Sequence, residues 1–190
     1  MIAHSELLLA FKSIEKDLSE EIKAFQIHKD KDLRIKIEQR VKSWPAPLAK
    51  RILDELFGLG PLEPLLNCQK YSEVIVGGFD RIWLKEGVQL KLSSEIFLSH
   101  WTFTNAISKI LSECQCRTDF HHATANGNFR GYRIHVAQKP LVEGDYEICF
   151  RRHFSEPWSL DEMEARGALT AFQKEYIESL LIERKTFFVV

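Results

Sequence analysis

In the first part of the chain, apolar residues recur every three or four positions, and charged residues fill the positions between them. This spacing places the apolar side chains on one face of a helix. It predicts a first helix, a second that Asp32 caps, and a third that ends before Gly58, a residue able to take the left-handed conformation of a helix end. Pro45 and Pro47 separate the last two helices, because proline disfavours helical backbone at the preceding residue. The apolar positions are Leu7, Leu8, Phe11, Ile14, Leu18, Leu33, Ile37, Val41, Leu48, Ile52, Leu53, Leu56 and Phe57, and Ile22 and Phe25 extend the first helix.

Beyond residue 58 the helical period gives way to short alternating segments. Residues 59–66 contain glycine and proline, so we expect a turn-rich connector there. The alternation that follows predicts two groups of strands with helices after each, which is an α+β fold. Ser159 is expected to cap one of the last helical segments, because Glu162 stands at the capping-box spacing. The expected strands are 73–76, 81–84, 88–92, 129–136 and 146–150, and the expected helices are 98–114, 160–164 and 172–183.

The composition is that of a globular protein, with 45% hydrophobic and 28% charged residues in 190. Lys and Arg total 26 and Asp and Glu total 27, which gives a net charge of -1. Nucleic-acid-binding domains carry a clear basic excess, so we expect no nucleic-acid partner. We find no run of roughly 20 apolar residues that would span a membrane and no basic, apolar leader after Met1. We therefore expect a cytoplasmic protein, or one on the cytoplasmic face of a membrane complex.

The sequence favours neither a metal site nor an enzyme site. Cys114 and Cys116 form C-x-C, which differs from the C-x-x-C of zinc knuckles and redox sites, and reduced structural thiols are expected. His121 and His122 are adjacent, so a strand would point them to opposite faces. The chain lacks the Walker A, dinucleotide-binding, zinc-protease and serine-hydrolase motifs, so we assign no catalytic residue and no metal ligand.

Four arginines flank the second group of strands. Arg130 and Arg133 lie near one expected strand, and Arg151 and Arg152 end the next, so antiparallel pairing would bring them close. Arginine binds phosphate through two parallel hydrogen bonds, and a cluster on rigid strands would suit that chemistry. Alternation turns Arg133 away from the apolar row that includes Ile134, and only one of Arg151 and Arg152 can share its face. From spacing alone, ordinary surface charge is the commoner explanation.

One segment carries a more specific pattern. Residues 55–66, Glu-Leu-Phe-Gly-Leu-Gly-Pro-Leu-Glu-Pro-Leu-Leu, resemble the connector of the type II and type IV secretion ATPases, in the branch that drives assembly of tight-adherence (Flp) pili. Residues 72–84 are similar to the first hairpin of that family. Gly77 departs from the pattern, because the family usually has asparagine in this turn.

The resemblance continues in the same order toward the end of the chain. Arg117-x-Asp119 matches a family Arg-x-Asp motif, residues 131–134 match Gly-Ser-Arg-Val, and residues 148–152 match Thr-Ile-Arg-Arg. Residues 167–170 resemble the segment that leads to the ATPase core. Residues 121–129 lack the proline that the family usually has, which affects the detail of that loop.

The resemblance implies a fold and a division of the chain. The helical spacing predicts that residues 1–57 form a small bundle, and the resemblance, which runs from about residue 50, implies that 58–184 form the α+β, PAS-like N-terminal domain of a secretion ATPase. Residues 185–190 would begin the strand that leads into the Walker A loop of a motor core. Arg133 and Arg151 occupy the positions of family arginines that reach nucleotide phosphates, and Arg152 would be a solvated or structural neighbour.

The same resemblance implies partners and cofactors. The full-length protein would use ATP and Mg²⁺, with neither bound tightly by this chain alone, which should be inactive. Its partners would be its own motor core, neighbouring subunits of a hexamer and an inner-membrane platform protein, so it would be cytoplasmic and peripheral at the inner membrane. The alternative is a regulatory module without a motor domain that binds a protein or a nucleotide. The reading frame after Val190 would distinguish the two.

Overall fold

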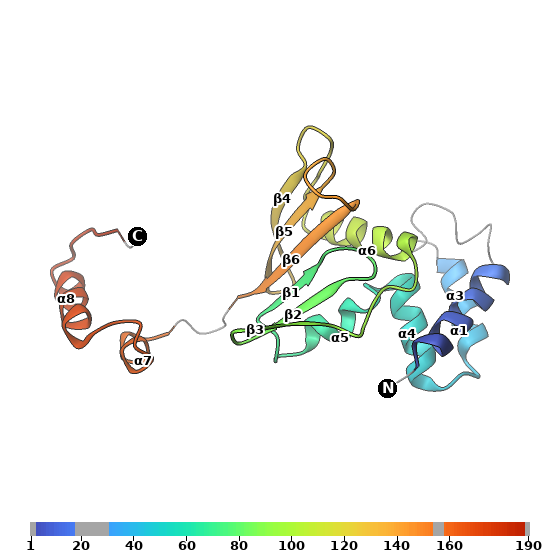
Figure 1. Cartoon of the computed structure of the whole chain (residues 1–190), viewed down its shortest axis with the longest axis horizontal. Helices are drawn as coiled ribbons and strands as arrows, with labels where there is room; N and C mark the ends of the chain where they lie inside the picture. The colour runs from blue at the N-terminus through green and yellow to red at the C-terminus, as the bar shows by residue number, and fades with distance from the viewer. Residues whose placement is uncertain (1–2, 18–30, 154–157, 189–190) are drawn as a thin grey trace. The chain divides into compact units, whose positions relative to one another are not determined.

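The computed structural model describes residues 3–17, 31–153 and 158–188. Contacts divide the chain into two compact units, Met1–His153 and Phe154–Val190, and each is described by itself (Figure 1). Leu18, Ile22 and Phe25, which the sequence pattern assigned to the first helix, lie outside the described residues.

The first unit begins with three of the predicted helices: α1 (His4–Asp17), α3 (Lys31–Val41) and α4 (Ala46–Phe57). Pro45 directly precedes α4, so the break predicted at the prolines lies between α3 and α4. The apolar faces of these helices share one core, in which each large buried side chain contributes roughly 1.5–3 kcal/mol. Its buried members are Leu7, Phe11, Ile14, Leu33, Ile37, Val41, Leu48, Ile52, Leu56 and Leu98.

The segment after α4 differs from the expectation in two ways. Gly58 ends the helix with φ −99°, and the left-handed conformation belongs to Gly60, at φ 60°. The N–H groups of both glycines donate to the carbonyl oxygen of Asp54, at 2.9 and 2.8 Å. The expected connector also contains a helix, α5 (Leu62–Asn67), for which Pro61 serves as N-cap. The leucines of α5 are buried in the sheet core, and that tertiary burial outweighs the turn propensity of the prolines.

A six-stranded antiparallel sheet follows, in the order β3-β2-β1-β6-β5-β4. The five strands that the alternation predicted are present, with ends that shift by a few residues. Pairing of β1 with β6 joins the first three strands and the last three strands into one sheet. The strands are β1 (Glu73–Val76), β2 (Ile82–Glu86), β3 (Gln89–Leu92), β4 (Thr124–Phe129), β5 (Tyr132–Gln138) and β6 (Tyr146–Arg152).

Strand β4 was missed by the sequence analysis, which began a strand only at Phe129. Its sequence, Thr-Ala-Asn-Gly-Asn-Phe, alternates polar residues with small ones, and only Phe129 is a large apolar residue, so the alternation is weak. The strand forms because its backbone pairs with β5 along the edge of the sheet, from Thr124 opposite Ala137 to Phe129 opposite Tyr132. Backbone pairing of this kind leaves little trace in side-chain polarity.

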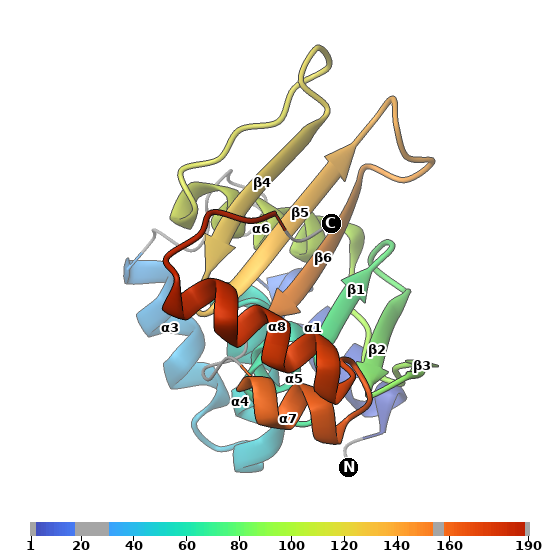
Figure 2. The same ribbon diagram turned by 90° about the vertical axis from the view of Figure 1, so that its left-hand side faces the viewer.

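Helix α6 (His100–Glu113) covers one face of the sheet together with α5 (Figures 1 and 2). It begins at Ser99, whose hydroxyl accepts from the N–H of Thr102, within a capping box. The opposite face of the sheet carries charged side chains such as Arg133 and Arg151, and also the exposed apolar residues Trp83, Leu90 and Leu92. The buried core between sheet and helices contains Val74, Val76, Ile82, Leu84, Phe97, Phe103, Ala106, Ile107, Ile110, Phe129, Tyr132, Ile134, Val136, Ile148 and Phe150.

A buried carboxylate ties the helices to this sheet layer. The side chain of Glu55 on α4 has no solvent exposure. One of its oxygens accepts from the N–H of Leu98 at 2.7 Å and from the hydroxyl of Thr102 at 2.5 Å, and the other accepts from Arg51 at 2.5 Å. Arg51 is itself buried and also donates to the carbonyl of Ile96. Both carboxylate oxygens of Glu55 therefore accept hydrogen bonds, as a buried charge requires.

The second unit contains α7 (Leu160–Ala165) and α8 (Ala171–Ile182). The predicted capping box of Ser159 and Glu162 is confirmed. Neither helix has a buried residue within the described chain. Residues 185–188 belong to no helix or strand, and Val189 and Val190 lie outside the described residues. The expected strand at 185–190 and the expected domain boundaries at 57/58 and 184/185 therefore stay predictions.

Candidate functional site

The register of the sheet places two of the arginines directly opposite each other. Arg133 on β5 pairs with Arg151 on β6, and both side chains are exposed. Tyr132 and Ile134, the residues on either side of Arg133, point into the core. The alternation of the strand therefore turns Arg133 toward the opposite, open face of the sheet, which α5 and α6 do not cover. Arg151 and Arg152 lie on opposite faces, as the same alternation predicted. The structure thus brings Arg133 and Arg151 together, while their role in binding nucleotide stays a prediction.

Glu73 on β1 holds the side chain of Arg151. Its carboxylate accepts from Arg151 Nε at 3.0 Å and from Lys85 Nζ of β2 at 3.1 Å. Partial burial by itself raises the pKa of Glu73, but the hydrogen bonds from Lys85 and Arg151 outweigh it and hold that pKa below its ordinary value. The carboxylate therefore stays ionised and fixes the direction of the Arg151 guanidinium.

These side chains form one row across four strands. The register runs from Lys85 through Glu73 and Arg151 to Arg133, so three cations accompany one carboxylate. The Arg133 side chain forms no hydrogen bond or ion pair with another described residue, and the Arg151 side chain remains 68% exposed although it is paired. The row can therefore receive an anion, and the two planar guanidinium groups suit the tetrahedral oxygens of a phosphate.

Arg152 has a structural position on the other face of the sheet. Its guanidinium donates to the backbone carbonyls of Cys68 at 2.6 Å, Tyr71 at 3.2 Å and Leu66 at 3.3 Å. It also lies over the ring of Tyr132, 4.8 Å from the centroid. Of the two roles expected for Arg152, solvated or structural, the contacts support the structural one.

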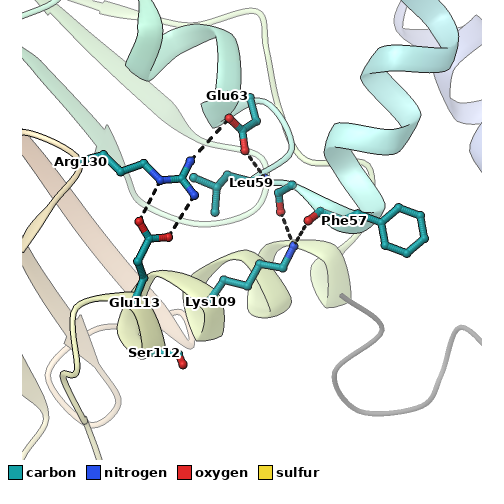
Figure 3. A pocket seen from close by; sticks show the side chains of 8 residues that line it. Phe57, Leu59, Glu63, Lys109, Ser112, Glu113 and Arg130 are labelled. Atoms are coloured by element: carbon teal, nitrogen blue, oxygen red, sulfur yellow. Dashed lines mark hydrogen bonds and ion pairs between the residues drawn. The ribbon is translucent and has the colours of Figure 1, made fainter. Parts of the chain in front are cut away.

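Arg130 lies in the turn between β4 and β5, apart from Arg133 and Arg151. Arg130 and Gly131 both have positive φ, at 47° and 83°, as the two central residues of a type I′ hairpin require. The side chain forms two hydrogen bonds of 3.0 Å to the carboxylate of Glu113 and lies 3.8 Å from Glu63 (Figure 3). The structure therefore places Arg130 at a different site from Arg133 and Arg151.

That site is a pocket of about 380 Å³ between the end of α4, α5 and α6. Lys109 reaches across it and donates to the carbonyl oxygens of Phe57 and Gly58, the second at 2.8 Å (Figure 3). These carbonyls lie at the end of α4, where a lysine is a favourable neighbour. Burial lowers the pKa of Lys109 to about 8. This contact joins α6 to the end of α4, and the ion pairs of Arg130 join the β4–β5 turn to α5 and α6, so both cations have structural roles.

Replacing Lys109 with methionine should flatten the pH dependence of stability at alkaline pH. In the folded chain burial lowers the pKa of Lys109 from 10.5 to about 8. Between these values the unfolded chain binds a proton that the folded chain does not, so the free energy of unfolding rises with pH. The folded chain avoids the cost of a buried charged amine completely above pH 10.5, and it bears that cost in full once the pH falls below about 8. Urea unfolding of both proteins across this range measures the slope.

Lys12→Met, on the exposed side of α1, is the control and should keep the parent slope. A Lys109→Met protein whose unfolding free energy rises with pH as steeply as that of the parent would contradict the effect of burial on this amine.

The adjacent histidines lie in a turn closed by a carboxylate. The carboxylate of Asp119 accepts from the backbone N–H groups of His121 and His122, both at 2.8 Å, and these bonds lower its pKa. In residues 3–17, 31–153 and 158–188, no group of three or more His, Cys, Asp or Glu side chains has an arrangement that could hold a metal ion.

Glu73 and Lys85 were not predicted from the sequence as members of the row that Lys85, Glu73, Arg151 and Arg133 form, here called the open-face row. Both lie in segments that were predicted as strands or directly beside them, but their pairing depends on the order of strands. The position of Glu73 at the start of an apolar strand could have predicted a cationic partner, because a partly buried carboxylate needs one.

The fold is that of a mixed helix and antiparallel-sheet protein, with a row of three cations and one carboxylate on its open sheet face. Among solved structures, this fold is similar to that of secretion ATPases. It matches the VirB11 ATPase of the Brucella suis type IV secretion system, in complex with sulphate, with a TM-score of 0.51 and 15% identity over 64% of this chain. A weaker match, to the Legionella pneumophila ATPase DotB, has a TM-score of 0.37 and 20% identity over 58% of the chain.

The chain spans 37% of the VirB11 chain and 32% of the DotB chain. At such low identity the VirB11 match establishes the fold alone. No protein-family model and no curated protein matches the chain. No helix among the described residues is long and apolar enough to cross a membrane.

Proposed function

We propose that this chain is the N-terminal part of an ATPase of the type II and type IV secretion class, in the branch that assembles tight-adherence pili. Arg133 and Arg151 contribute positive charge to the nucleotide interface of a hexamer. Movement of the domain against the motor core couples ATP hydrolysis to pilus assembly or protein secretion. The working protein is cytoplasmic and contacts an inner-membrane platform protein.

The observation that carries this proposal is the exposed pair of Arg133 and Arg151 in direct register, with Arg151 oriented by Glu73. Family arginines at the matching positions reach nucleotide phosphates, and the fold is similar to that of a type IV secretion ATPase. Two guanidinium groups fixed on neighbouring strands offset the charge that develops on a transferred phosphoryl group, at little cost in reorganisation.

The described residues suit the phosphate part of MgATP better than its metal. The open-face row supplies three cations around one carboxylate, and Lys85 and Arg151 already occupy that carboxylate. Magnesium in such ATPases is held by a Walker A serine or threonine and a Walker B aspartate, which belong to a motor core. ATP and Mg²⁺ are therefore cofactors of the complete protein in this proposal.

The reading frame that follows Val190 tests the proposal directly. A Gly-rich segment that ends in Gly-Lys-Ser or Gly-Lys-Thr, followed by a core with a Walker B carboxylate, is the expected result. The protein expressed with that core should hydrolyse ATP and form a hexamer. A stop codon, or a downstream domain without a nucleotide-binding motif, would favour the regulatory module instead.

The chain alone should show no ATP turnover. It contains no Walker A motif, so it lacks the loop and lysine that hold the β- and γ-phosphates and the hydroxyl that holds Mg²⁺. Phosphate release by the purified 190-residue chain, measured against a heat-denatured sample, checks this. Sustained release well above that sample would mean that the chain has a catalytic site of its own.

A further inference from the structure

The end of α6 fixes two cysteines at a defined spacing. Gln115 has φ 54° and turns the backbone into the left-handed region directly after Cys114, the C-cap of α6. The N–H of Cys116 donates to Leu111 at 2.9 Å and that of Gln115 to Ser112 at 3.2 Å, the two bonds of a Schellman motif. Backbone geometry therefore positions both cysteines, although the sequence shows only C-x-C.

Both thiols point at the edge strand β4. Cys114 Sγ lies 3.1 Å from the carbonyl oxygen of Asn128, and Cys116 Sγ lies 3.2 Å from that of Asn126, so each thiol donates to the edge of the sheet. Gly127 lies between these acceptors. A Cβ atom there would meet Cys116 Sγ at 2.9 Å and Cys114 Sγ at 3.6 Å. Both sulfurs therefore approach the position that a side chain of this residue would occupy, and glycine leaves that position free.

The number of donors decides which ligand this pair suits. Zinc needs four ligands in a structural site, and no group of three or more metal-ligating side chains exists in the part of the chain that the structure describes. Two thiolates alone satisfy a soft monovalent ion such as Cu(I), which thiolates select and which accepts two-coordinate binding. Both cysteines are partly exposed, so an ion can reach them.

We propose that Cys114 and Cys116, with Gly127 between them, form a two-thiolate site for a soft monovalent metal ion of the Cu(I) class. On binding, each S–H loses its proton to solvent, its hydrogen bond to the β4 carbonyl breaks, and each sulfur forms one bond to the ion, with no change of oxidation state. The site is independent of the open-face arginines and of the proposed ATPase role.

Transfer of Cu(I) from its coloured bicinchoninate complex tests the site under anaerobic, reducing conditions. The full 190-residue chain should take up about one equivalent of Cu(I). Cys114→Ser and Cys116→Ser should each abolish this uptake. Cys68→Ser and Cys149→Ser remove thiols elsewhere in the fold and should leave it unchanged. No uptake by the parent chain, or undiminished uptake by the double variant of Cys114 and Cys116, would overturn the proposal.

A glycine substitution separates this geometry from general binding by thiols. Gly127→Ala keeps all four cysteines but pushes its Cβ against Cys116 Sγ, so it should weaken Cu(I) uptake. Gly77→Ala is the matched control, because its Cβ would meet nothing within 4 Å. Circular dichroism confirms that both variants are folded. Equal uptake by the two folded variants would show that the space at Gly127 plays no part in the site.

Discussion

Alanine in place of Arg133 or Arg151, in the chain joined to its motor core, is expected to lower ATP turnover by a factor on the order of 10³. Each guanidinium would stabilise charge on the transferred phosphoryl group, and the loss of an arginine in that role leaves the charge unbalanced in the transition state. Steady-state phosphate release gives the turnover, and titration with a fluorescent nucleotide gives the affinity.

The two arginines should differ in one respect. Arg151 is held by Glu73, while Arg133 has no side-chain partner in the described chain, so Arg151→Ala also leaves the carboxylate of Glu73 with Lys85 alone. A small loss of stability is therefore expected for Arg151→Ala and none for Arg133→Ala. A thermal unfolding measurement on each variant separates this effect from the loss of turnover.

Arg81→Ala is the control for the turnover experiment. Arg81 is 57% exposed beside the turn between β1 and β2, away from the row of cations, so turnover should not change. Arg152 is unsuitable as a control, because it holds three backbone carbonyls and its loss would disturb the fold. If folded Arg133→Ala and Arg151→Ala proteins keep their turnover and nucleotide affinity, both residues are ordinary surface charges.

Glu55→Ala is expected to destabilise the first unit by about 3–5 kcal/mol, the cost of breaking a buried ion pair from one side. The substitution leaves Arg51 buried without its carboxylate and removes the acceptor of the Leu98 N–H and the Thr102 hydroxyl. Because the network joins α4 to the start of α6, its loss should separate the helical layer from the sheet layer. Urea unfolding followed by tryptophan fluorescence measures the change.

Two variants test this explanation. Glu38→Ala removes an exposed ion pair with Arg34 on α3 and should cost under about 0.5 kcal/mol. Combining Glu55→Ala with Arg51→Met removes the unpaired charge as well, so the double variant should be more stable than Glu55→Ala alone. If Glu55→Ala proved no more harmful than Glu38→Ala, the buried network would have no part in joining the layers.

The family-like segment at residues 55–66 gains a physical explanation from these contacts. Glu55 satisfies the buried network, and Gly60 adopts φ 60° where a Cβ would meet Glu55 and Phe97 at 2.9 Å. The carboxylate of Glu63 accepts from the N–H of Leu59 at 3.1 Å and also approaches Arg130. Glu55 and Glu63 therefore accept specific hydrogen bonds, and Gly60 is required by its conformation and by close packing.

Local patterns were sufficient for much of the first unit. The three- and four-residue spacing of Leu7, Phe11 and Ile14 predicted a helix face, because that period belongs to the helix itself. Alternation predicted five of the six strands and turned Arg133 away from the core for the same reason. The resemblance to secretion ATPases, drawn from short ordered motifs, agrees with the fold of the VirB11 match.

Other features depended on partners far away in the sequence. Strand β4 and helix α5 form because β5 and the sheet core lie beside them. Their own residues give only a weak signal, because β4 has just one large apolar residue and the leucines of α5 stand among prolines. Glu73 meets Arg151 only because β1 pairs with β6, 78 residues later. Strand order and register depend on the pairing energy of whole strands and on the burial of one sheet face. Neither can be predicted from the residues of one segment alone. The sequence by itself therefore determined most of the helices and strands and the outward direction of Arg133, because these depend on local periodicity. Only the tertiary structure decided which charges, thiols and carbonyls meet, because those contacts join segments far apart in the chain.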